Sequence, residues 1–408
     1  MHTHQHPYTS VLTHLSTHLP HSGPLFRRIQ HQTIHPSPTA QVLASFPPNS
    51  DSDLGPGIRT RTETETDTEI PWLAAYADIH NGPDTQVWLF SSLETKSNLA
   101  TSESESQSRS KSSTRPSNSE PISSQETEVT KSQLHSLFTL IRSTLIPPYL
   151  DWVSSQPRAT APIPAKEERV KKIPNHPATS VLAGTVHKTL VSLICELAKE
   201  SKVRILRGQD VFYSKYCFAS SAFDGRNGVE DEDLGDGGEW WERDGYGFTD
   251  SNGVSGIQEK HLDLVKSRTS IPRSKRALLA MGGVALYHYP SLVSGDGGDE
   301  GKEKGEAEMP IAWAFLGFDG SLCTLHVEPE HRGRGLAGMV GKEVMKRGVE
   351  VFGSSYLDST STPGGQAGAR EEWFFADVAI ENAASRRVME KMDGVERWNV
   401  AWMVVEVD

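Results

Sequence analysis

Periodic apolar stretches alternate along the chain with polar stretches that lack large apolar side chains. A helical pattern begins at Val11, and the strand-like run TAQVLASF follows it and stops at Pro47-Pro48. Two more strands are expected at 72–79 and 85–94, because β-branched and aromatic residues are bounded there by turn residues. These elements predict the start of an α+β region.

Helical periodicity returns in the middle of the chain. A helix is predicted over 131–146, and Pro147-Pro148 is expected to end it. A second amphipathic helix is predicted over about 183–200, and a strand-like segment follows at 203–219. We expect an N-terminal α+β region over residues 8–222.

Several polar stretches interrupt this region. Residues 49–69, 95–130 and 154–178 are rich in Thr, Ser, Glu, Pro or Lys, and we expect them to be disordered because they cannot bury enough apolar surface. Residues 223–254 form an acidic, Gly-rich stretch that we interpret as a linker.

The C-terminal region, 255–408, has the most regular pattern. Strands are predicted at 284–289, 311–318 and 321–327, and Asp319-Gly320 predicts a hairpin between the last two. The remaining elements are predicted in the order helix, strand, helix and strand, at 336–350, 373–380, 382–392 and 398–407.

The composition of the chain argues against several classes of partner and site. The net charge of −12 argues against a nucleic-acid partner, because phosphate binding needs a basic face. The three cysteines lack metal-site or disulfide spacing, and His2, His4 and His6 near the N-terminus are not expected to hold a metal. No run reaches the ~18 apolar residues of a membrane span, and no secretory signal is evident, so we expect no membrane contact and a cytoplasmic, or alternatively nuclear, location.

The sequence LHVEPEHRGRGLAGMV, at 325–340, carries the candidate chemistry. A strand runs through a Gly-rich turn into a helix, whose first amides lack intrahelical partners and favour negative charge. Glycines allow close approach of a diphosphate, and Arg332 and Arg334 add cationic groups. The turn is therefore predicted to hold a pyrophosphate.

Two cofactor classes contain a pyrophosphate. GRGLAG, at 333–338, matches the dinucleotide pattern, and Asp358 lies ~20 residues beyond, where a ribose-binding acid is expected. That fold requires a parallel βαβαβ half, whereas the strands here are predicted to form hairpins. Coenzyme A is the other class.

The residues around this turn resemble a known family. Arg332-x-x-Gly335-x-Ala337 is similar to the signature of GCN5-related N-acyltransferases (GNAT), and Asn382-x-x-Ser385 after strand 373–380 is similar to their second element. AWAFLGFDGSLCTLHV with VEPEHRGRGLAG resembles the FR47 and glycine-N-acyltransferase-like branch. The resemblance covers about 255–408.

The resemblance implies an α+β fold with a mixed, mostly antiparallel sheet flanked by helices, preceded here by a second α+β region that could be a degenerate copy. It implies that strands 321–327 and 373–379 splay apart and hold the pantetheine arm of acetyl-CoA or another acyl-CoA, with no metal. The implied CoA contacts are Leu325, Val327, Arg332, Gly333, Arg334, Gly335, Leu336, Ala337, Asn382 and Ser385.

Catalysis would need an oxyanion donor and a base. The Leu325 amide is the implied donor to the thioester oxygen. Asp377, a carboxylate inside an apolar strand, is the leading candidate base, although it could equally be a structural hydrogen-bonding group. His326 and Glu328 are the other candidates; a packed histidine and a solvated glutamate are their plainer interpretations.

The sequence departs from the family at two positions. Met389 stands where the family often has a tyrosine that protonates the leaving thiolate, and Ser321 stands where it often has an acid. We therefore expect an N-acyltransferase that transfers an acyl group from acyl-CoA, with acetyl-CoA as the commonest donor, to a primary amine. The alternatives are an inactive CoA-binding scaffold and a dinucleotide oxidoreductase. The expected acceptor is a small-molecule amine or amino acid, with a peptide or protein amine as an alternative, and the oligomeric state is open.

Overall fold

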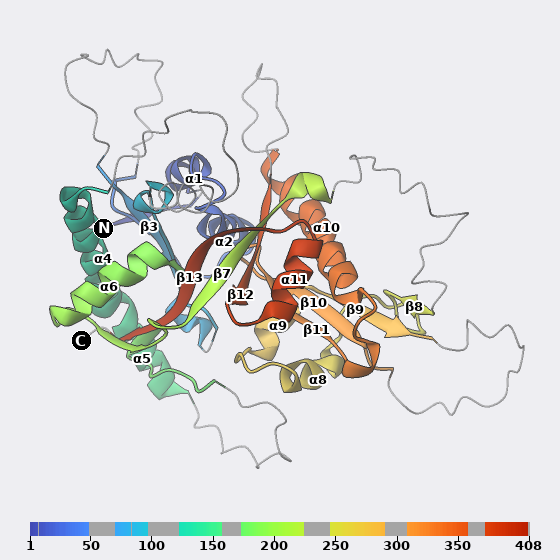
Figure 1. Cartoon of the computed structure of the whole chain (residues 1–408). Coiled ribbons are helices and arrows are strands. Elements are labelled where there is room, and N and C mark those ends of the chain that lie inside the picture. The colour runs from blue at the N-terminus through green and yellow to red at the C-terminus, as the bar shows by residue number, and fades with distance from the viewer. Residues whose placement is uncertain are drawn as a thin grey trace, which may run out of the picture. The chain divides into compact units, whose positions relative to one another are not determined.

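The computed structural model describes residues 1–6, 8–48, 70–82, 84–96, 122–156, 173–223, 245–289, 308–357 and 372–406 (Figure 1). The chain divides into two compact units. The first comprises 1–160, 176–215 and 397–408, and the second comprises 161–175 and 216–396. The last segment of the chain thus belongs with the N-terminal unit rather than with the region that precedes it.

The first unit contains a mixed sheet. Its strands are β1 (His2–His4), β2 (Gln41–Ala44), β3 (Leu73–Ala77), β4 (Val87–Ser91), β5 (Ser180–His187) and β13 (Val395–Glu406), in that order, with β6 (Arg204–Arg207) also paired to β13. Every neighbouring pair is antiparallel except β4 and β5, which run parallel. The predicted strands at 72–79 and 85–94 are confirmed as β3 and β4.

Helices cover this sheet. They are α1 (Thr9–Ser16), α2 (Gly23–Ile34), α4 (Ser124–Leu140), α5 (Ile146–Ser155) and α6 (Lys188–Lys199), with a π-helical turn at Ile141–Leu145 and a 3-10 turn at Ile79–Asn81. Leu134, Phe138, Leu190 and Ile194 from α4 and α6 are fully buried against strands β3 to β5. The apolar periodicity of both helices therefore follows from packing on one sheet face.

The prediction that Pro147-Pro148 ends a helix was wrong. The π-helical turn at Ile141–Leu145 leads directly into α5, and the prolines occupy its first turn. Proline lacks an amide hydrogen, and a first-turn amide has no intrahelical acceptor, so proline is tolerated there.

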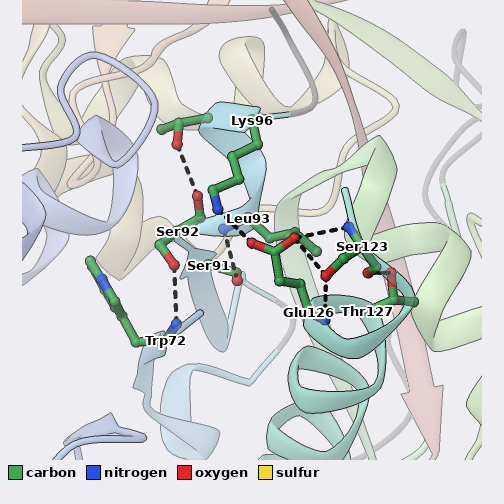
Figure 2. Close-up of polar contacts among 9 residues, drawn as sticks. Trp72, Ser91, Ser92, Leu93, Lys96, Ser123, Glu126 and Thr127 are labelled. Atoms are coloured by element: carbon green, nitrogen blue, oxygen red, sulfur yellow. Dashed lines mark hydrogen bonds and ion pairs between the residues drawn. The ribbon is translucent and has the colours of Figure 1, made fainter. Parts of the chain in front are cut away.

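The beginning of α4 lies inside the stretch 95–130 that was predicted to be disordered. Ser123 Oγ accepts a hydrogen bond from the Glu126 amide, and Glu126 Oε2 accepts from the Ser123 amide at 2.9 Å. Lys96 pairs with the other Glu126 oxygen at 2.5 Å, as Figure 2 shows. This capping box fixes the helix start, so the prediction was wrong for 122–130. Residues 97–121 and 49–69 lie outside the described residues.

The predicted helix 183–200 was wrong at its start. Residues 180–187 form β5, and the helix begins only at Lys188. Strand pairing with β4 and β13 overrides the local apolar pattern. His187 then caps α6, since its Nδ1 accepts from the Thr189 amide at 3.2 Å.

The second unit is built on a four-stranded antiparallel sheet. Its order is β11 (Leu322–Val327), β10 (Ala312–Leu316), β9 (Gly283–His288) and β8 (Tyr246–Gly247). Strand β12 (Trp373–Ala379) lies beside β11, and β7 (Phe212–Ala219), which crosses the unit boundary, neighbours β12. The hairpin predicted at Asp319-Gly320 is confirmed, and Gly320 adopts a φ of 74° there. Strand β8 was missed because it lies in the stretch interpreted as a linker.

Helices lie on both faces of this sheet. Helices α10 (Leu336–Leu357) and α11 (Ala383–Lys391) pack with one set of alternating strand residues, and α8 (Leu262–Ser267) and α9 (Lys275–Met281) pack with the other. Short 3-10 turns occur at Ser220–Ala222, Glu259–His261 and Pro329–His331. Trp313 and Phe315 of β10 point towards α8 and α9, whereas Ala312 and Ala314 point towards α10. The expected α+β class, with mostly antiparallel sheets and flanking helices, is confirmed.

Candidate active site

The turn between β11 and α10 has the geometry of an anion site. Gly333 and Gly335 adopt φ values of 81° and 78°, which favour glycine, and α10 begins at Leu336. Among the described residues, the amides of 333–337 have no hydrogen-bond acceptor, and the first amide with one is that of Gly338, which donates to the Gly335 carbonyl at 3.0 Å. Five neighbouring donors therefore remain available at a helix N-terminus.

Two arginines flank these amides. Arg332 is exposed and donates from Nε to the Val327 carbonyl at 2.9 Å, which leaves its two Nη groups for an anion. Arg334 donates from Nη1 to the hydroxyl of the buried Tyr246 at 3.1 Å, and this hydroxyl also contacts His331 Nδ1 at 3.1 Å. Both guanidinium groups are thus held at the turn, and charge-assisted contacts to phosphate are stronger than neutral ones.

Strand β11 contains a bulge just before this turn. Trp313 of β10 pairs with His326 and Phe315 pairs with Cys323, so Thr324 and Leu325 together oppose the single residue Ala314. Thr324 has a φ of 54°, which is rare for a β-branched residue. Bulges redirect backbone groups near functional sites, and this one lies at the predicted oxyanion donor, Leu325.

Strands β11 and β12 meet only at one end. Ser321 forms an isolated parallel bridge with Phe375, whose amide donates to the Gly320 carbonyl at 3.0 Å. Beyond that bridge, no ladder joins the two strands within the part of the chain that the structure describes. The resemblance predicts an opening for the pantetheine arm between these two strands.

A small pocket opens beside the bulge. It is lined by Thr324, Leu325 and His326 of β11, Trp313 of β10, and Val265, Arg268 and Thr269 in and after α8. Sequence analysis missed Thr324, Arg268 and Trp313. They could not be found from one sequence, because neither a β-bulge nor the packing of α8 near β11 has a sequence pattern.

His326 is the candidate base that lines this pocket. Its ring stacks on the buried Trp313 with centroids 4.7 Å apart, and its Nε2 lies 3.7 Å from Glu328 Oε2. Burial lowers the pKa of His326, Glu328 acts in the opposite direction, and Arg332 and Arg268 lower it further. The ring is therefore neutral at neutral pH and able to accept a proton.

The other predicted residues occupy different places. Asp377 lies on β12 with both carboxylate oxygens buried, and it is not among the pocket-lining residues. Asn382 caps α11, where its Oδ1 accepts from the Ser385 amide at 3.1 Å. Leu336 is buried at the start of α10. Asp358, part of the dinucleotide interpretation, lies outside the described residues, and the turn follows an antiparallel strand rather than opening a parallel half.

Met389 is 2% exposed and packs in the core beneath α10. The three cysteines are free. In the described ranges no cluster of three or more His, Cys, Asp or Glu residues could hold a metal, and none of the helices there is both long and apolar enough to cross a membrane.

Residues 1–216 match the family described as the N-terminal domain of the acyl-CoA N-acyltransferase verG. This chain belongs to that family. The match covers more than half of the 408 residues, and it lies in the half where the sequence shows no catalytic motif. Membership in the VerG_N family confirms the recognition of an acyl-CoA N-acyltransferase, which rested on the other half.

Comparison of this VerG_N chain with curated proteins finds no match. Among solved structures, a Drosophila protein is 12% identical with a TM-score of 0.49, and the alignment covers 98% of this chain and 97% of that one. A putative GNAT-family acetyltransferase from Novosphingobium aromaticivorans is 12% identical with a TM-score of 0.30, covering 51% and 68% of the two chains.

A GCN5-related N-acetyltransferase from Kribbella flavida is 10% identical with a TM-score of 0.29, covering 53% of this chain and 64% of that one. All three TM-scores are below 0.5, so these likenesses establish neither the fold nor the activity of the VerG_N chain.

Proposed function

We propose that this chain transfers an acetyl or other acyl group from acyl-CoA to a primary amine by direct attack on the thioester. The observation that carries the proposal is the row of amides at 333–337, which have no acceptor among the described residues. They are flanked by two guanidinium groups and come directly after a bulged strand. Membership in an acyl-CoA N-acyltransferase family agrees with it.

The described residues fit a CoA pyrophosphate. The amides of Gly333, Arg334, Gly335, Leu336 and Ala337 would donate to its oxygens, as helix N-termini do for phosphates. Arg332 would add charge, while its Nε bond to Val327 ties the turn to the end of β11. The Asn382 side chain already caps α11, so the Ser385 side chain is the more available of the two for contact with the cofactor arm.

The bulge supplies the electrophilic assistance in this proposal. Pantetheine would run along β11 where it diverges from β12, with its amides pairing to the main chain at Leu325 and Val327 like an added strand. CoA supplies the thioester. The Leu325 amide would then donate to the thioester oxygen as that oxygen gains negative charge, and such donors lower acyl-transfer barriers by roughly 3–4 kcal/mol.

The second candidate function is a CoA-binding protein without catalysis. The observation that favours it is Met389, a buried thioether at the position where the family often places a proton-donating tyrosine. The two candidates share the CoA site and differ only in turnover, so one set of measurements separates them.

The test combines binding and turnover on the full chain. Thermal shifts are measured with CoA, acetyl-CoA and NADH, and acetyl-CoA consumption is screened against amino acids, polyamines, aryl amines and peptides. Stabilisation by CoA with turnover of at least one amine is the expected result. Stabilisation without turnover favours the inactive protein, and stabilisation by NADH alone would refute both.

A further inference from the structure

Three side chains from two elements form a chain of contacts that ends in the pocket beside the bulge. Arg268 Nε, just after α8, lies 2.9 Å from Glu328 Oε1, and the other Glu328 oxygen lies 3.7 Å from His326 Nε2. One carboxylate therefore joins the arginine to the imidazole. All three side chains are largely buried.

The orientation of the His326 ring follows from these contacts. Trp313 stacks on one ring face with an interplanar angle of 23°. Nε2 is buried on the side of Glu328. Nδ1 is consequently the nitrogen that faces the pocket, and among the described residues it has no hydrogen-bond partner.

We propose that His326 is the general base of acyl transfer in this pocket, and that Glu328 and Arg268 are positioning residues that hold its ring. The inference rests on the proposed N-acyltransferase function. It places the acceptor amine in the pocket formed by Thr324, Leu325 and the residues that follow α8, next to the thioester carbonyl at the Leu325 amide.

The proton and electron balance is complete within this arrangement. The acceptor nitrogen attacks the thioester carbon, a C–N bond forms, the C–S bond breaks, and CoA leaves with the electron pair of that bond. Nδ1 of His326 takes the surplus proton of the amine, directly or through one water. The proton held on His326 then passes, directly or through water, to the leaving thiolate, and the products are an amide and CoA thiol.

The charged groups around His326 fit this role. Glu328 lies on the same segment, Arg268 comes from the α8 side, Arg332 comes from the turn before α10, and the β10 neighbour is the apolar Trp313. Burial is the largest influence and lowers the pKa of His326, so the base form is present at neutral pH. Glu328 acts on the ring through its charge, because its Oε2 lies 3.7 Å from Nε2, beyond hydrogen-bond distance.

Asp377 is the competing base. It lies on β12, across the opening from β11, and does not line the pocket. The pH dependence of turnover distinguishes the two assignments. Turnover falls at low pH because the base becomes protonated, so a variant that lacks the true base should no longer show this fall. The decisive comparison is therefore His326→Gln against Asp377→Asn.

The experiment measures turnover against pH with acetyl-CoA and an amine found in the screen, and the dissociation constant of CoA by thermal shift. For His326→Gln we expect a fall in kcat of roughly a hundred-fold or more, no acidic limb, and unchanged CoA affinity. Asp377→Asn is expected to keep the acidic limb. Wild-type turnover with a retained acidic limb in His326→Gln, or its loss in Asp377→Asn, overturns the proposal.

The positioning role has its own readout. Glu328→Gln removes the anion that raises the pKa of His326, so the acidic limb of the rate profile should move to lower pH, and Glu328→Asp should partly restore it. The imidazole pKa followed by NMR in the same variants reports this shift without turnover; an unmoved imidazole pKa overturns it. Absence of CoA binding by the wild-type chain would instead refute the proposed function.

Discussion

Arg332 donates from Nε to the carbonyl oxygen of Val327, 2.9 Å away, and so joins the end of β11 to the turn that begins α10. One guanidinium group would therefore have two tasks in the proposed function: its Nε holds the turn against the strand, and its Nη groups would bind the pyrophosphate. The affinity for CoA should depend on both.

The Arg332→Glu variant should bind CoA about ten-fold to a hundred-fold more weakly. A charge-assisted hydrogen bond is worth about 1.5–3 kcal/mol, and the substitution also places an anion near phosphate. Calorimetric titration with CoA measures the change. The matched control is Arg276→Glu, an exposed arginine on α9, which should bind as the wild type does. Equal affinity of a folded Arg332→Glu would contradict the assignment of the turn.

Two glycines of α10 should respond oppositely to alanine. A Cβ at Gly348 would clash with Leu316 and lie 2.9 Å from Phe374 Cε1, so Gly348→Ala should lower the free energy of unfolding by about 1–3 kcal/mol. At Gly338 the nearest atom would be Met392 Cγ at 3.7 Å, and Gly338→Ala should raise it by about half a kcal/mol through helix propensity. Urea denaturation compares the pair, and equal effects would disprove the close packing of α10 on β10 and β12.

The capping box of α4 should contribute measurably to the stability of the first unit. Ser123→Ala removes the hydroxyl that accepts from the Glu126 amide and should cost about 1 kcal/mol. Ser132→Ala, at an exposed position within the same helix, should cost nothing. Urea midpoints provide the measurement, and a Ser123 variant as stable as the control would show that the cap is dispensable.

Acid should destabilise the first unit through His187. Burial lowers the pKa of His187 to about 3, and the nearby His21 and Lys188 act in the same direction. The unfolded chain takes up a proton near pH 6.5 whereas the folded chain does not, so the free energy of unfolding falls as pH drops from about 6.5 towards 3, by at most about 1.4 kcal/mol per pH unit for this group.

The His187→Asn variant should flatten this pH dependence. Asparagine keeps a side-chain acceptor for the Thr189 amide at the start of α6 but does not titrate. Denaturation series at several pH values, with the wild type in parallel, give the two slopes. Burial also lowers the pKa values of His21 and His31, to about 4 and about 3, so some pH dependence should remain in the variant. Identical slopes for the variant and the wild type would show that His187 does not contribute to the pH dependence.

The sequence alone determined the glycine-rich turn at 333–335 and the elements on either side of it. Glycines at 333 and 335, two arginines and a following apolar helix pattern are local properties, and local backbone preference and periodicity are readable from one chain. The same holds for the β10–β11 hairpin at Asp319-Gly320.

Only the tertiary structure decided which side chains meet in the pocket. Arg268 and Glu328 are separated by 60 residues, and Thr324 takes a positive φ only because β11 is held in a bulged register against β10. Likewise 180–187 became a strand because sheet pairing overrode local preference, whereas Pro147-Pro148 are tolerated because they lie in the first turn of α5. Contacts between distant segments have free energies comparable with local helix and strand preferences. The local pattern therefore predicts the turn, but it does not predict which residues face it.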